Sequence, residues 1–169
     1  TGIIMAVTGS SRAVPVGGVG TFDGVMLGAF NAPRVEGRFT GERMRAWDVT
    51  WGTGTADVVV ENSYALIENA VITKGPGRMD VSGKFSLGYP RRDGGEELDA
   101  RIYAKRWPIV DVRMAFELYD TELNGLGSGE FHLYDKYEEP LGFGRVVIEH
   151  GTSYDETFDR FEAGLRFEG

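Results

Sequence analysis

The stretch LDARIYAK, from Leu98 to Lys105, decides the fold class. Leu98, Ala100, Ile102 and Ala104 are apolar, and the residues between them are charged or tyrosine. Side chains of a β-strand point alternately to opposite faces, so this period of two predicts a strand with one apolar and one wetted face. Such a strand is typical of an antiparallel sheet.

The same alternation recurs along the chain, and glycine-rich turns separate the repeats of the pattern. Alternating runs lie at residues 35–39, 79–85, 111–119 and 161–167, with turn signals at 52–55, 74–77 and 90–95. The run from Asp111 is expected to be a strand, with a short turn around Pro108. The sequence therefore predicts an all-β protein of short antiparallel strands: a meander, a sandwich or an open barrel-like roll.

Composition excludes several classes of protein. The chain has 169 residues, a formal net charge of −8, 25 glycines, two histidines and no cysteine. Without cysteine there is no disulfide framework, zinc–thiolate site or cysteine nucleophile. The acidic balance disfavours nucleic-acid binding, which needs a basic surface. The chain does not begin with Met and stops just after a strand-like run, so we expect a segment of a longer protein.

An internal repeat organises the chain. At an offset of 107 residues, Gly18 and Gly20 align with Gly125 and Gly127, and Pro33 aligns with Pro140. We therefore expect a single segment, 1–169, of a repetitive β-rod, in which residues 18–61 are repeated at 125–168. Repeats that stack bury a continuous face, and function tends to run along their length.

No catalytic or metal-binding pattern is present. His150 lies beside Glu149, but a hydrolytic triad drawn from its neighbours is a free choice, and His132 is expected on a wetted face. The run from Gly17 to Gly24 lacks the spacing of a nucleotide-binding loop. We predict no enzyme activity, no metal and no cofactor.

The run AFNAPRVEGRFTGERMRAWDVTWGTGTADVVVENSYALIENAVIT, residues 29–73, resembles the repeats of the bacterial TamB (translocation and assembly module) and AsmA-like family. The matching residues include Pro33, Val35, Gly37 and Phe39, followed by the IENA of Ile67–Ala70. Residues 125–169 resemble the start of a second copy of the same repeat pattern. The resemblance covers almost the whole chain and carries no catalytic signature.

This resemblance implies a fold, a location and a function. It implies antiparallel strands curled into a U-shaped β-taco, an open jelly-roll-like groove with an apolar interior. It implies a periplasmic rod, part of an inner-membrane-anchored protein of a diderm bacterium, whose groove shields phospholipid acyl chains during transport between the inner and outer membranes. The implied partners are phospholipid acyl chains, neighbouring repeats of the same chain and an outer-membrane barrel protein of the TamA type, with no nucleic acid.

Alternation then selects candidate residues for the lining of that groove. Each is an apolar residue on the apolar side of an expected strand. The predicted lining residues are Val35, Phe39, Val58, Val60, Ile67, Val81, Phe85, Ile102, Met114, Phe116, Phe131, Leu133, Leu165 and Phe167.

Two other functions fit the same pattern. Exposed strand edges can pair with a client strand, which suits a β-strand-binding module that assists outer-membrane protein translocation and assembly. A β-sandwich for adhesion or sugar binding would instead have a closed core and aromatic residues on a flat outer face, a role open to Trp47 and Trp51. Periodicity alone does not distinguish an open groove from a covered core.

Overall fold

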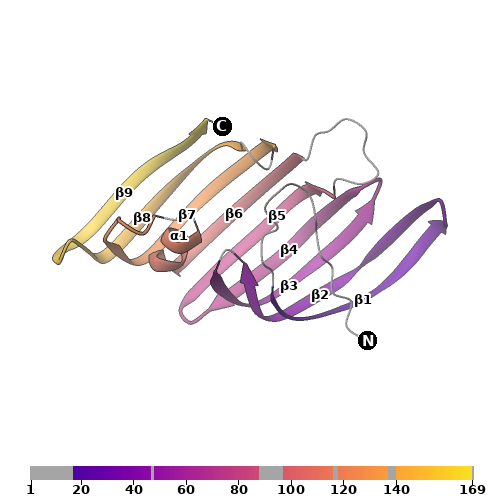
Figure 1. Cartoon of the computed structure of the whole chain (residues 1–169), viewed down its shortest axis with the longest axis horizontal. Helices are drawn as coiled ribbons and strands as arrows, with labels where there is room; N and C mark the ends of the chain where they lie inside the picture. The colour runs from indigo at the N-terminus through magenta and orange to yellow at the C-terminus, as the bar shows by residue number, and fades with distance from the viewer. Residues whose placement is uncertain (1–16, 47, 88–96, 116–117, 137–139, 169) are drawn as a thin grey trace.

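The structure, a computed structural model, describes residues 17–46, 48–87, 97–115, 118–136 and 140–168. These residues form one nine-stranded antiparallel sheet in which the strands follow one another in sequence order (Figure 1). One short helix lies between the sixth and seventh strands. The elements are β1 (Gly17–Ala29), β2 (Ala32–Ala46), β3 (Val49–Glu61), β4 (Tyr64–Lys74), β5 (Gly77–Ser86), β6 (Glu97–Pro108), α1 (Ile109–Ala115), β7 (Leu123–Lys136), β8 (Pro140–Ser153) and β9 (Glu156–Glu168).

The sheet is an open meander. Tight turns reverse the chain: Asn62 and Ser63, between β3 and β4, both have positive φ, 51° and 63°. Two such residues form the hairpin turn whose twist matches the flanking strands. The all-β, antiparallel prediction is thus confirmed. The predicted U-shaped curl is not seen, because this sheet is neither closed nor strongly curled (Figure 1).

Strands β1–β3 and β7–β9 correspond at an offset of 107 residues. The strand bounds agree within one residue. The cross-strand pair Gly20↔Gly41 has its counterpart in Gly127↔Ile148, and Val35↔Val60 has its counterpart in Gly142↔Phe167. Backbone irregularities match too, because Arg43 and His150 share a φ of 51°. The β1–β2 and β7–β8 pairs therefore share their register and their bulge. The β2–β3 pair has a further irregularity at Met44 that the β8–β9 pair does not show.

The strand predicted from Asp111 is wrong, because residues 109–115 form the helix α1. Alternation in this run suggested a strand, but tertiary contacts override a pattern of this length. Pro108 precedes the helix and suits its first turn, while Asp111 lies in that turn, where its charge is favourable. A helix of seven residues is not stable alone, so its packing on the sheet holds it in place.

Glycine and aromatic residues are packed against each other on one face of the sheet. A methyl group on Gly37 would lie 2.8 Å from the Phe22 ring, and one on Gly20 would lie 2.7 Å from the Phe39 ring. The rings thus pack against backbone that has no side chain. The high glycine content makes room for these rings.

Adding a side chain at such a glycine should destabilise the sheet. The Cβ of Gly37→Ala would overlap the carbonyl oxygen of Asp23 and the Phe22 ring. We expect a loss of about 2 kcal/mol in the free energy of unfolding, measured by urea titration. Gly164→Ala is the control, because its Cβ meets nothing within 4 Å, and it should change stability by less than about 1 kcal/mol. Equal effects of the two substitutions would contradict this account of the glycines.

Candidate functional site

One face of the sheet carries apolar rows that cross the strands. Residues paired across antiparallel strands share a face, so the register identifies each row. The central row crosses all nine strands and contains only apolar residues and glycine. It consists of Gly24, Gly37, Val58, Ile67, Gly83, Ala100, Leu133, Gly142 and Phe167.

Three parallel rows complete what we call the apolar face. One row contains three phenylalanines: Phe22, Phe39, Ala56, Ala70, Val81, Ile102, Phe131, Gly144 and Leu165. A second is rich in glycine and alanine: Gly20, Gly41, Gly54, Ile72, Met79, Ala104, Gly129, Val146 and Ala163. The last lies on the first six strands: Met26, Val35, Val60, Ala65, Phe85 and Leu98.

The structure brings nearly all of the predicted lining residues together on this face. Two are exceptions. Met114 lies on α1, where its side chain is exposed, so its assignment to a strand lining was wrong. Phe116 lies outside the described residues. The rest occupy the four rows, because strict alternation places them on one side of every strand.

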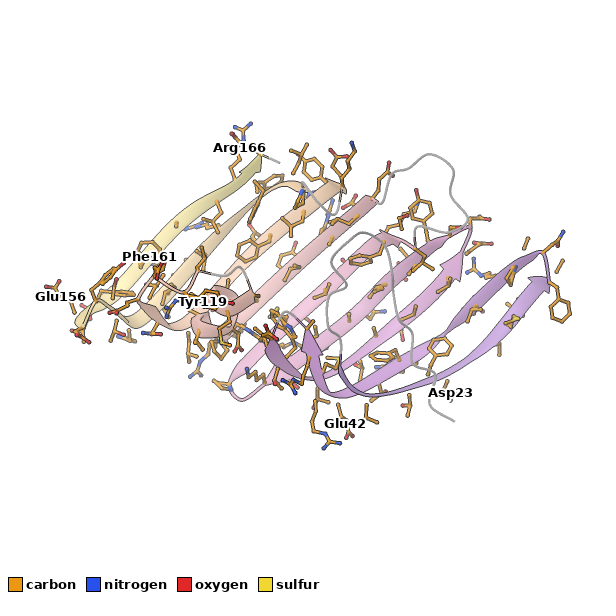
Figure 2. The ribbon with its side chains drawn as sticks, viewed as in Figure 1. Asp23, Glu42, Tyr119, Glu156, Phe161 and Arg166 are labelled. Atoms are coloured by element: carbon orange, nitrogen blue, oxygen red, sulfur yellow. The ribbon has the colours of Figure 1, made fainter. Side chains whose placement is uncertain are left out.

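The apolar face is only partly covered. Phe22 keeps 44% of its surface exposed and Leu165 keeps 40%, although both belong to an apolar row. The helix α1 packs against β7 and β3 at one end of the strands, the end where Phe161 also lies (Figures 1 and 2). Side chains fully buried in the described chain are concentrated near this end and include Trp107, Ile148 and Val49.

Two tryptophans fix the helix end of the apolar face. The rings of Trp51 and Trp107 stack with their centroids 5.9 Å apart. Ile109, the first residue of α1, fills the space above Gly127, where a Cβ would overlap its side chain. Trp51 is therefore part of this packing and not of a flat outer platform. Trp47 lies outside the described residues.

A buried ion pair attaches α1 to β4. The Lys74 Nζ donates to both carboxylate oxygens of Asp111, at 2.8 and 2.7 Å. The Asp111 side chain is 7% exposed, whereas that of Lys74 is 31% exposed. A carboxylate this deeply buried needs its cation, because an unpaired buried charge is strongly destabilising.

The opposite, polar face carries ion pairs between strands. Arg38 and Asp57 pair at 2.9 Å, and His132 Nε2 lies 2.7 Å from Asp99. His132 thus lies on the wetted face, as predicted. Hydrogen bonds from Arg160 and Arg145 lower the pKa of Glu162 below its ordinary value. Charges of this kind keep the polar face in water and leave the apolar face as the candidate site.

The described residues contain no group of three or more histidine, aspartate or glutamate side chains arranged to hold a metal ion. No helix among them has the length and apolar character needed to cross a membrane. Comparison with protein families, with curated proteins and with solved structures finds no match for this chain. The candidate site therefore rests on the geometry of the apolar face.

Sequence reasoning missed the anchor of α1. Trp51 stacks on Trp107, which is 56 positions away in the chain, and Lys74 pairs with Asp111, which is 37 positions away. Alternation along one strand does not reveal contacts between residues so far apart. One local signal existed, the Trp-Pro step with an acidic residue three positions after the proline. It was outweighed by the period of two that follows it.

Removal of Lys74 should loosen α1. Lys74→Met leaves the Asp111 carboxylate buried without its cation, so we expect a loss of about 3 kcal/mol in the free energy of unfolding. The double variant Lys74→Met/Asp111→Leu should recover most of that loss. Urea titration followed by tryptophan fluorescence measures both. A double variant as unstable as the single one would show that the ion pair is not the cause.

The pKa of Glu162 should report its ion pairing on the polar face. The hydrogen bond from Arg160, 3.1 Å long, is the largest cause of its lowered pKa. Arg160→Gln should move the pKa up towards the ordinary carboxyl value, as followed by an NMR pH titration of the Glu162 side chain. Because the folded pKa is depressed, this pairing stabilises the fold above the ordinary value and is lost as pH falls through the folded pKa. An unchanged pKa would contradict the assignment.

Proposed function

We propose that the apolar face shields phospholipid acyl chains from water, and that this sheet is one section of a longer surface along which lipids pass between two membranes. The observation that carries the proposal is the central row, which crosses nine strands without a charged or polar side chain. A monomeric domain normally covers such a face with a second layer. Among the described elements, only α1 lies over it, and only at one end.

The dimensions of the face suit an acyl chain. Rows on one face of a sheet are two residues apart, so four rows make a strip about 20 Å wide. Eight spacings of about 4.8 Å separate β1 from β9, which gives a path of about 38 Å. The width is comparable to the length of one extended acyl chain, and the path is about twice as long. The path crosses the strands, in the direction in which a repetitive sheet grows.

The energetics favour such a surface. Each methylene exposed to water costs about 0.8 kcal/mol, so a chain of roughly fifteen methylenes faces a barrier of about 12 kcal/mol on leaving a membrane. Contact with the apolar face lowers that barrier while the headgroup stays in water. Apolar side chains and glycines offer the acyl chain no polar contact, so we expect binding to be loose and the lipid to keep moving.

The resemblance to the TamB and AsmA-like family supports the choice of phospholipid and of a periplasmic setting. The U-shaped curl expected from that family would raise the shielding further, since it would enclose the chain on two sides. In this proposal the open sheet gives one wall of the groove, and α1 covers part of one of its rims.

Photolabelling tests the proposal directly. The purified 169-residue chain is mixed with vesicles that contain a phospholipid with a photoreactive diazirine midway along one acyl chain. After irradiation, peptide mass spectrometry locates the adducts. We expect them on residues of the apolar face, such as Ile102 and Leu165, because the acyl chain lies against these rows. We expect few on the polar face.

A matched pair of variants serves as the control. Leu165 lies on the apolar face and Leu66 on the polar face, and both are 40% exposed. Leu165→Glu should reduce labelling of β8 and β9 several-fold, whereas Leu66→Glu, placed opposite Lys84, should leave labelling unchanged. Equal labelling of the two faces, or none while circular dichroism shows an intact sheet, would rule out the acyl-chain assignment.

The strand-binding alternative uses a different surface. A client strand would pair with the backbone at a sheet edge, whereas an acyl chain lies on the face. Unfolded β-rich peptide copurifying with the chain, insensitive to Leu165→Glu, would favour that alternative.

A further inference from the structure

The two edges of the sheet differ in chemistry. Every residue of β1 is exposed, and Asp23 is the only charged residue in that strand. Strand β9, at the other edge, carries six charged residues among thirteen. Proteins normally protect a free edge with charges, because an uncharged edge pairs with other strands. The edge of β9 is protected in this way and that of β1 is not (Figure 2).

The correspondence between β1 and β7 shows which kind of strand pairs with the edge that β1 leaves exposed. Strand β7 corresponds to β1 at the offset of 107 residues, with the same register to the next strand and the same bulge. The outer edge of β7 is occupied by β6. Gly18 and Gly125, at the matching bulges, have similar φ values of 125° and 135°.

We infer that the free edge of β1 is a docking site for a strand of the β6 type, an extended segment with apolar and charged residues in alternation. Transfer of the β6–β7 register onto β1 places Ala104 opposite Phe22, Ile102 opposite Gly24 and Ala100 opposite Met26. Each large side chain then faces a small one, which is the complementarity that cross-strand packing needs. This inference rests on register and edge chemistry and not on the proposed function.

The charges of the two strands are compatible in that register. Arg101 falls opposite Val25 on the polar face, and Tyr103 falls opposite Asp23. Lys105, two residues further along the strand, is then diagonal to Asp23, the one charge of β1. No like charges meet. A docked strand would also continue the apolar face past β1.

A peptide of residues 97–115, labelled with a fluorophore, serves as the probe, and anisotropy with the 169-residue chain measures its affinity. Val25→Glu faces Arg101 of the peptide and should tighten binding about two- to five-fold, and Val25→Lys should weaken it by a similar factor. A peptide with Arg101→Glu should reverse that order. Identical affinities for both variants would overturn the register.

Disulfide formation between introduced cysteines shows which strand edge binds the peptide. The chain has no cysteine of its own, so no native thiol competes. A Val25→Cys chain should couple at least about ten-fold faster to a peptide with Arg101→Cys than to one with Tyr103→Cys, because directly opposed Cβ atoms are close enough and diagonal ones are not. Arg166→Cys on β9 is the matched control and should react slowly with both.

Three outcomes would overturn the inference. Equal coupling at Arg166→Cys would show non-specific capture. A Val25→Cys chain that forms a covalent homodimer in preference to the peptide product would assign the edge to a second copy. Failure of both peptides to couple, with an unchanged circular dichroism spectrum, would show that the β1 edge does not accept this strand. Lipid is absent from these assays, so their failure leaves the photolabelling result unaffected.

Discussion

The antiparallel hydrogen-bond ladder is the constraint on which the rest of the structure depends. It fixes which residues lie opposite one another, and with a period of two it fixes which face they share. Because every strand pairs with its sequence neighbours, a row such as Gly24, Gly37 and Val58 continues across the sheet in register. The apolar face, the ion pairs of the opposite face and the correspondence of β1–β3 with β7–β9 all follow from that register.

Alternation predicted the fold class and the face to which most lining residues belong. It worked because strands such as residues 98–105 have one period and few competing signals. It did not predict the shape of the sheet, since an open sheet, a sandwich and a curled groove share the same alternation. The curvature of the sheet depends on the combined bending at bulges such as those at Arg43 and His150. The hydrophobic pattern of the sequence does not predict that combined bending.

The helix α1 shows where local pattern fails. Residues 111–115 alternate like a strand, yet they form a helix because Trp107 stacks on Trp51 and Asp111 pairs with Lys74. These contacts join segments that are distant in the chain, so no window of sequence reveals them. The same helix gives the candidate site its asymmetry, because it covers part of one rim of the apolar face, over β7 and β3, and leaves the others without a covering element among the described residues.

The nearest-neighbour pairing of the strands also determines how the sheet responds to force. Each strand is bonded only to the strands before and after it in the chain. Tension applied between Gly17 and Glu168 therefore pulls across the ladder and opens hydrogen bonds one after another. A sheet loaded in this way unzips strand by strand at low force, and hairpins whose strands are joined by a tight turn, such as β3 and β4, close again locally. The architecture is thus mechanically compliant along its long axis and stiff along its strands.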